Sequence, residues 1–119
     1  GATGNTIMAA VTAEGTTIIK NAAQEPEIES LCIFLKKMGA DIAGQGSNEI
    51  LIKGQKELHG GIEFNVMPDR IEAGTYLIAA AITKGDVVLV NVNPNHMRMR
   101  WGNILIGGDS IEVVVCRYN

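Results

Sequence analysis

An internal repeat limits the folds open to this chain more than any other feature of its sequence. A pair of alanines, a glycine, an asparagine and a proline recur in the same order, with an apolar run between the glycine and the asparagine. The two copies are Ala9-Ala10, Gly15, Asn21, Pro26 and Ala79-Ala80, Gly85, Asn91, Pro94. Glycine commonly ends a helix and proline fits the first position of a helix. We therefore predict two tandem units of order helix–strand–helix–strand–strand, residues 1–67 and 68–119, which bury their faces against neighbouring units.

The first unit can be divided into elements by its hydrophobic pattern. We expect a thin, Ala-rich helix over 5–14 that stops at Gly15, and a strand over 16–21. A second helix should begin at Pro26 and stop at Gly39, because its apolar residues recur at steps of three and four. These residues are Ile28, Leu31, Cys32, Leu35 and Met38. Two strands are expected over 41–45 and 49–53, on either side of a Gly-Ser-Asn turn.

The link and the second unit follow a similar pattern. Ile62, Phe64 and Val66 alternate with polar residues after Gly60-Gly61, which predicts a half-buried strand that Pro68 ends. A helix is expected over 69–83 with a stop at Gly85, and a strand over 87–91. The helix that follows Pro94 is shortened relative to its counterpart. The last strands are expected over 104–106 and 111–116.

Composition excludes several classes of protein. With 119 residues, 46% of them hydrophobic, the chain can form one compact domain. Its formal charge of -3 argues against nucleic-acid binding. Cys32 and Cys116 lie in apolar segments without metal-type spacing, so we expect reduced core thiols, no metal and a reducing cytoplasm. No apolar run approaches the ~20 residues of a membrane span, and the sequence shows no signal peptide.

Few motifs point directly to chemistry. No nucleophile–base pair is visible, and His59 and His96 are interpreted as surface residues. Asp69 and Glu72 have the spacing of a capping box, so structure alone explains them as well as function does. The pair Glu25 and Glu27 likewise suits a helix start. The run Gly1-Ala2-Thr3-Gly4 before a helix is able to cradle a phosphate, although any Gly-rich helix start has this property.

Longer stretches of the sequence are more specific than these motifs. The informative runs are Gly1-Ala2-Thr3, Ala13-Glu14-Gly15-Thr16-Thr17-Ile18-Ile19, Asn21-Ala22-Ala23, Glu25-Pro26-Glu27-Ile28, Phe34-Leu35, Met38-Gly39-Ala40 and Pro68-Asp69-Arg70-Ile71-Glu72-Ala73-Gly74-Thr75. In this order they closely resemble the UDP-N-acetylglucosamine enolpyruvyl transferases of bacterial peptidoglycan synthesis. The resemblance runs from Gly1 to about Pro94 and covers roughly a quarter of the usual length of that family.

The resemblance implies a fold and a reaction. The fold is α/β (α+β), an inside-out barrel in which each of two domains packs three such units with helices inside and sheets outside. The reaction moves enolpyruvate from phosphoenolpyruvate to UDP-N-acetylglucosamine, with no cofactor. The catalytic Cys loop and the Lys-Asn pair of the family are not found here, so no catalytic residue is assigned.

The resemblance also suggests six substrate-binding residues. Gly1 and Thr3 correspond to the part of the family site that holds the nucleotide diphosphate. Glu25 and Glu27 match an acidic pair that faces the interdomain cleft, and Asp69 and Glu72 match acids near that cleft. These residues are Gly1, Thr3, Glu25, Glu27, Asp69 and Glu72.

The sequence departs from the family pattern after Pro94, where residues 96–101 replace a longer helix, and the tail 116–119 matches nothing familiar. We interpret the chain as a fragment or rebuilt piece of such a transferase, inactive alone. The alternatives are a non-catalytic, self-folding structural module, natural or engineered, and a subunit that a partner chain completes. We also expect a homo-oligomer, because six apolar helix residues would otherwise face water. They are Ile7, Met8, Val11, Leu77, Ile78 and Ile82.

Overall fold

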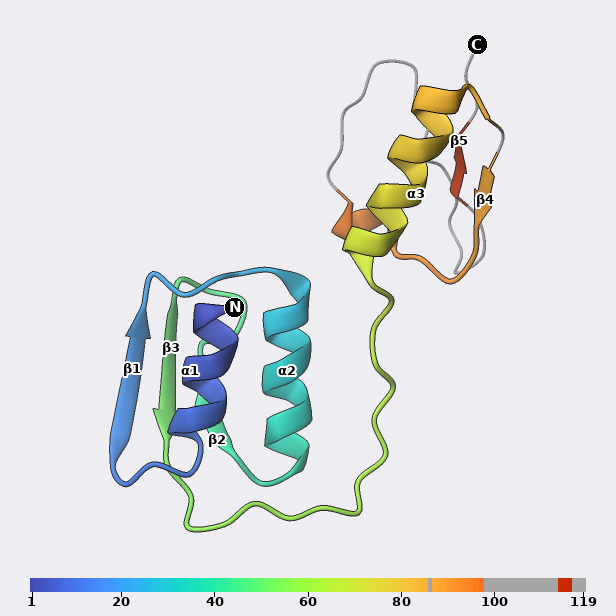
Figure 1. Cartoon of the computed structure of the whole chain (residues 1–119). Coiled ribbons are helices and arrows are strands. Elements are labelled where there is room, and N and C mark those ends of the chain that lie inside the picture. The colour runs from blue at the N-terminus through green and yellow to red at the C-terminus, as the bar shows by residue number, and fades with distance from the viewer. Residues whose placement is uncertain (86, 98–113, 117–119) are drawn as a thin grey trace. The chain divides into compact units, whose positions relative to one another are not determined.

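The computed structural model describes residues 1–85, 87–97 and 114–116, and it divides the chain into two compact units, Gly1–Met67 and Pro68–Asn119. The first unit contains α1 (Ala2–Ala10), β1 (Thr16–Lys20), α2 (Pro26–Lys37), β2 (Asp41–Ala43) and β3 (Glu49–Lys53). The second contains α3 (Arg70–Thr83), β4 (Val87–Leu89), the 3₁₀ helix η1 (Pro94–His96) and β5 (Val114–Cys116). Both units thus mix helices with antiparallel sheet (Figure 1).

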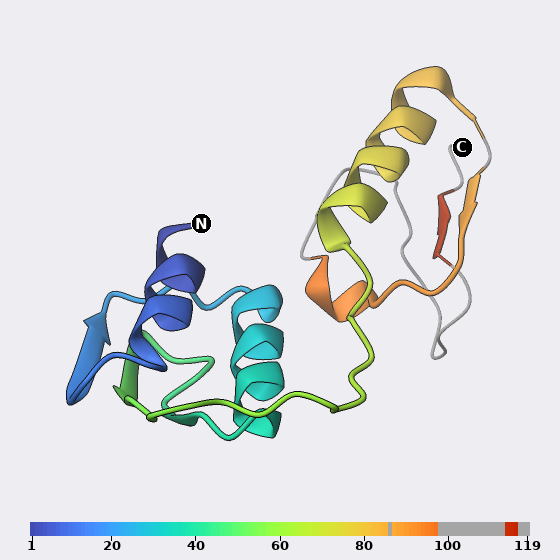
Figure 2. The same ribbon diagram turned by 60° about the horizontal axis from the view of Figure 1, so that its bottom comes forward.

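The first unit is a two-layer structure. Its strands form an open antiparallel sheet in the order β1-β3-β2, with Ile18 opposite Leu51 and Ile42 opposite Ile52. Helices α1 and α2 pack beside each other on one face of this sheet (Figures 1 and 2). Ile50 and Ile52 point toward the helices and are fully buried, whereas Glu49 and Lys53 of the same strand are exposed. This alternation is the two-residue period of a strand with one covered face.

Helix α2 confirms its prediction closely. Pro26 occupies the first turn, and acidic residues in that turn and lysines in the last turn complement the helix dipole. Cys32 and Leu35, from the expected apolar stripe, are buried in the core of the unit. Gly39 has φ +100°, a conformation that glycine adopts without strain, and it ends the helix as predicted.

Helix α1 differs from its prediction at both ends, since it covers Ala2–Ala10 rather than 5–14. The early end has a tertiary cause. The backbone N–H of Gln55 donates to the carbonyl of Val11 (2.8 Å), and Ala13 N–H donates to Ala10 in a turn. The chain therefore leaves the helix four residues before Gly15, where the sequence pattern placed the stop.

The segment between β3 and α3 does not form the strand that we expected over residues 62–66. Ile62 and Phe64 are half-buried and Glu63 is exposed, as the alternation predicted, but Val66 is 85% exposed. No strand among the described residues pairs with this segment. Phe64 instead packs edge-on against Phe34 of α2, with ring centroids 5.2 Å apart. Lys37 Nζ lies 5.7 Å from the Phe64 ring centroid and donates to the Glu63 carbonyl (3.3 Å). Contacts with a helix thus take the place of a β ladder.

The second unit packs α3 against a two-stranded antiparallel sheet, with Val87 opposite Cys116. The buried face of α3 consists of Ala73, Gly74, Leu77 and Ala80. The helix ends where expected, but Lys84 takes the left-handed conformation (φ 53°) and Gly85 N–H then donates to Ala80 (2.9 Å). A single 3₁₀ turn, η1, stands where the shortened helix was expected. The strand expected over 104–106 and the start of the one over 111–116 lie outside the described residues.

The expected exposure of four residues, Ile7, Val11, Leu77 and His96, needs correction. Ile7 and Val11 are buried in the core of the first unit, and Leu77 is buried in the core of the second. Met8, Ile78 and Ile82 do face solvent. His59 is exposed as expected, whereas His96 is half-buried and its Nε2 lies 3.0 Å from Asn93 Nδ2. Among the described residues, no helix is long and apolar enough to cross a membrane.

Candidate functional site

Four of the six residues assigned from the sequence gather at one end of the first unit. Helices α1 and α2 both begin at this end (Figures 1 and 2). Gly1 is the N-cap of α1 and Thr3 lies in its first turn, while Glu25 is the N-cap of α2. Glu27 lies in the first turn of α2. The structure therefore brings together Gly1, Thr3, Glu25 and Glu27, as two adjacent helix starts.

One hydrogen bond ties these two helix starts together. The backbone N–H of Ala23, in the loop that leads to α2, donates to Thr3 Oγ1 at 3.1 Å. This bond spans 20 residues of sequence and is partly buried. It uses an acceptor site of the Thr3 hydroxyl, whose O–H is left to donate to another group.

The phosphate-cradling loop that we expected at the N-terminus is wrong in its detail, because residues 2–4 are already helical. Gly4 is buried, and a Cβ at this position would lie 3.5 Å from Leu31 and 3.6 Å from Ile28. A Cβ at this position would thus meet both side chains of α2 at ordinary van der Waals distance. The anion-attracting feature of this end is the first turn of α1, where backbone N–H groups have no partner within the helix.

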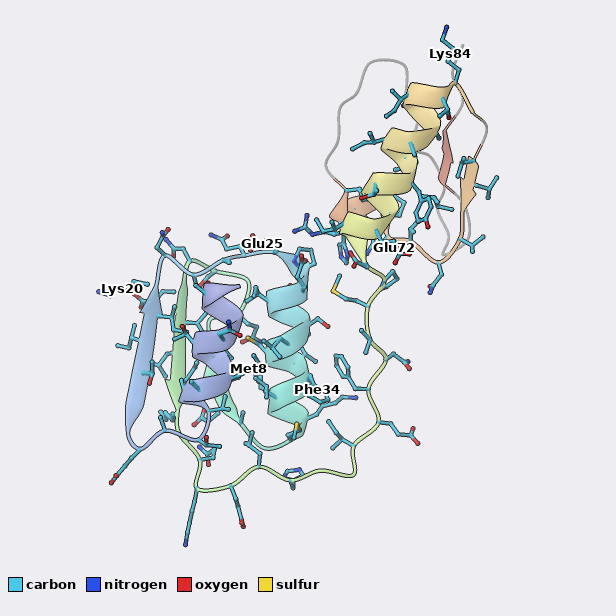
Figure 3. The ribbon with its side chains drawn as sticks, in the orientation of Figure 1. Met8, Lys20, Glu25, Phe34, Glu72 and Lys84 are labelled. Carbon is cyan, nitrogen blue, oxygen red and sulfur yellow. The ribbon has the colours of Figure 1, made fainter. Side chains whose placement is uncertain are left out.

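The acidic pair at the start of α2 has a different environment. Glu25 has extended backbone and its side chain makes no capping bond, although its carbonyl accepts from Ile28 N–H (2.9 Å). Glu27 is exposed and borders an apolar groove of about 300 Å³ on the surface of α2. The groove is lined by Glu27, Ser30, Leu31, Phe34, Phe64, Val66 and Met67. Both carboxylates stand at the positive end of the helix dipole, which stabilises their charge. Glu25 and Glu72 are labelled in Figure 3.

The other two assigned residues, Asp69 and Glu72, share a groove in the second unit. Asp69 is the N-cap of α3, and its Oδ1 accepts from the N–H groups of Ile71 (2.8 Å) and Glu72 (3.1 Å). The described residues contain this half of the capping box only, since the Glu72 carboxylate makes no return bond to Asp69 N–H. The groove has a volume of about 370 Å³ and is lined by Pro68, Asp69, Glu72, Ala73, Tyr76 and Val88 to Val92.

The chemistry of this groove is mixed. Two exposed carboxylates and the Tyr76 hydroxyl can exchange hydrogen bonds with a hydroxyl-rich ligand, while the valines of β4 and the residues after it provide an apolar wall. Sequence reasoning found the two acids and missed Tyr76 and the valine wall. Nothing in their local pattern marks them, because the groove forms only when β4 packs beside α3.

The one cysteine whose side chain is described carries no reactive character. Cys32 is a free thiol, fully buried in the core of the first unit. Burial raises the pKa of this thiol, and the nearby charge of Lys36 lowers it by less. The thiolate needed for nucleophilic attack is thus disfavoured. Within the described part of the chain, no three His, Cys, Asp or Glu side chains form a group that could hold a metal ion.

The comparisons with known proteins show the family to which the chain belongs. Residues 1–109 match the family model of EPSP synthase (3-phosphoshikimate 1-carboxyvinyltransferase), and the chain belongs to this family of carboxyvinyl transferases. The similarity thus continues beyond Pro94, where we had placed its end.

Within the family, the chain is similar to proteins named UDP-N-acetylglucosamine 1-carboxyvinyltransferase. It is 55% identical to the one from Chlorobium chlorochromatii over 112 residues, 94% of this chain and 26% of that relative. It is 62% identical to the one from Chlorobium luteolum over 97 residues, 82% of this chain and 23% of that relative. The chain thus spans about a quarter of the length of these relatives.

Proposed function

We propose that this chain is a piece of a cytoplasmic transferase that moves enolpyruvate from phosphoenolpyruvate to UDP-N-acetylglucosamine in peptidoglycan synthesis, and that it is inactive alone. The observation that carries the proposal is the 62% identity to a relative of that name, of which the chain covers 23%. Cys32 supports the proposal, because its buried thiol, with a raised pKa, is not suited to act as a nucleophile.

The six assigned residues are proposed to bind the sugar nucleotide in the longer enzyme. The free N–H groups at the start of α1, next to Gly1 and Thr3, suit a diphosphate. The Asp69 and Glu72 carboxylates border a groove with room for a polar ligand, and they can accept hydrogen bonds from its hydroxyl groups. Glu25 and Glu27 are proposed to face the same substrate from the start of α2.

The two units are further proposed to be copies of one repeat, of the kind found in the inside-out barrel. Asn21 and Asn91 support this correspondence, because each follows a strand and each takes a positive φ, 54° and 55° respectively. In both units the strand after the first helix also pairs antiparallel with the last strand. When the two units are superposed, Gly15 should fall on Gly85 and Asn21 on Asn91.

Activity is tested by measuring phosphate release from phosphoenolpyruvate in the presence of UDP-N-acetylglucosamine. We expect no release above the buffer control, because the Cys loop and the Lys-Asn pair of the family were not found in this sequence. Groups of this kind accelerate a reaction by many orders of magnitude. Turnover that is lost on Cys32→Ala or Cys116→Ala would contradict the proposal, since it would place the nucleophile in this chain.

A binding experiment distinguishes the proposed substrate-binding function from the alternative, a self-folding module without a substrate. The experiment is an NMR titration with UDP-N-acetylglucosamine up to about 10 mM, a concentration that detects binding free energies as weak as ~3–4 kcal/mol. We expect chemical-shift changes confined to the six assigned residues and Ala23. Thr3→Val should remove the shift at Ala23, and Thr3→Ser should retain it. Complete absence of shifts would favour the module and would reject the assigned sites.

We also propose that the chain self-associates, because large apolar side chains on both units face solvent. They are Met8, Ile18, Ile33, Val66, Ile71, Tyr76, Ile78, Ile82, Val88 and Val90. Covering such side chains stabilises an assembly by roughly 1.5–3 kcal/mol each when burial is complete.

A further inference from the structure

Residues 60–67, here called the strap, run along helix α2 in the direction opposite to the helix. Just before the strap, His59 N–H donates to the carbonyl of Met38, the residue that follows the last turn of α2 (2.9 Å). At the end of the strap, Met67 lines the same groove as Glu27, which lies in the first turn of α2. The strap thus passes from the last turn of α2 to its first turn (Figure 1).

One side chain, that of Phe64, holds the strap on the helix. Its ring is half-buried and packs edge-on against Phe34, and an aromatic pair in this geometry is attractive beyond the area that it buries. Lys37 adds a cation–π contact with the Phe64 ring and a hydrogen bond to the Glu63 carbonyl. Figure 3 labels Phe34 on the side of α2 that faces the strap. Because the strap has no β-ladder partner among the described residues, these side-chain contacts position it.

The strap is held less closely after Phe64. Val66 is 85% exposed. The apolar groove of about 300 Å³ lies where Val66 and Met67 pass the first half of α2, so close packing on the helix is missing there. Phe64 is therefore the last firm attachment of the strap to α2.

We propose that Phe64 is the anchor that sets the free length of the connection between the two units. While Phe64 is docked, residues 65–68 lie between the anchor and Asp69, the N-cap of α3, and they span at most about 14 Å. When Phe64 is released, the free segment begins after the bond of His59 and covers residues 60–68, which span at most about 32 Å. Release of the anchor thus more than doubles the reach of the connection.

The anchor is able to open without unfolding either unit. The buried core of the first unit is built from α1, α2 and the sheet, and Phe64 and Lys37 are not among its residues. Contacts that are few and partly exposed to solvent open more readily than a core does. A single substitution at the anchor should therefore release the strap and leave the fold of the first unit intact.

The proposal is tested by NMR relaxation of the backbone amides in the full chain. In the unaltered chain we expect order parameters for residues 62–64 close to the ~0.85 of rigid backbone. Phe64→Ala should lower them to below about 0.6, while the amides of β3 stay rigid. Val66→Ala is the matched control, because it truncates an apolar side chain of the same strap at an exposed position, and it should leave these order parameters unchanged.

Two results of this experiment would overturn the proposal. Flexible amides at residues 62–64 in the unaltered chain would show that the strap is not docked in solution. Rigid amides there in Phe64→Ala would show that other residues hold it. If Phe64→Ala also loosens β3, Lys37→Met provides an independent test, since it removes the cation and the donor but keeps the aromatic pair. It should lower the order parameters in part, and unchanged values would count against the anchor.

The free length itself is tested by measuring distances between spin labels at Met8→Cys and Ile82→Cys in a Cys116→Ser background. Both positions are exposed within their own units. Labelled chains are diluted with unlabelled ones, so that only distances within one chain are recorded. Phe64→Ala should roughly double the width of the distance distribution, in line with the longer reach of the free segment. Equal widths with and without Phe64 would reject its role as the anchor.

Discussion

Gly54 is the position where the structure makes the sharpest prediction about stability. It follows β3 and lies against the turn between α1 and β1, where its N–H donates to the Gly15 carbonyl at 2.9 Å. A Cβ at residue 54 would overlap the carbonyl oxygen of Ala13. The obstacle is backbone rather than a flexible side chain, so Gly54→Ala must push the turn away from the end of the sheet.

The cost of this substitution can be worked out from the contacts that it disturbs. Overpacking of a well-packed site costs about 1–3 kcal/mol. Two hydrogen bonds also hold the turn to this strand end, Gly54 N–H to Gly15 and Gln55 N–H to Val11 (2.8 Å), and each is worth about 0.5–1.5 kcal/mol. We therefore expect Gly54→Ala to lower the free energy of unfolding by about 3 kcal/mol, a large part of a total of ~5–15 kcal/mol.

The assay is urea unfolding followed by far-UV circular dichroism, with hydrogen exchange of the β3 amides as a readout of the first unit alone. Gly60→Ala is the matched control, because Gly60 has no positive φ and a Cβ there meets nothing within 4 Å. This control should stay within about 0.5 kcal/mol of the unaltered chain. If the two alanine variants have equal stability, the close approach of residue 54 to the turn does not exist.

Two further predictions concern a cap and a thiol. Asp69→Ala should cost about 1 kcal/mol and shorten α3, because the N–H groups of Ile71 and Glu72 lose their acceptor, while Asp69→Asn should retain most of the stability by the same urea assay. Burial raises the pKa of Cys32, so the folded state favours the protonated thiol. This contribution to stability is complete below the unfolded thiol pKa of about 8.5, and it is lost as the pH rises through the higher pKa of the folded state. The urea midpoint should thus fall more steeply above about pH 8.5 in the unaltered chain than in Cys32→Ala, and equal slopes would contradict the buried thiol.

Local signals were sufficient to find most of the secondary structure. The apolar stripe, Pro26 and Gly39 predicted α2, and Asp69 and Gly85 predicted the ends of α3, because caps and periodicity act within a few residues. The alternation in residues 62–66 predicted the half-buried Ile62 and Phe64 but was wrong for Val66, which is 85% exposed, and no strand forms there. A strand needs a neighbour to pair with, and a single segment of sequence does not specify one.

The sequence by itself determined the family, the helices α2 and α3, and the identity of the acidic residues near the helix starts. Only the tertiary structure decided where α1 ends, because that end depends on a bond from Gln55 to Val11 across the unit. It also decided that Thr3 joins the starts of α1 and α2, that Gly54 has no room for a side chain and that Tyr76 and the valines share a groove with Asp69. These features join residues far apart in the chain, and the free energy of such contacts depends on packing geometry that no local pattern encodes.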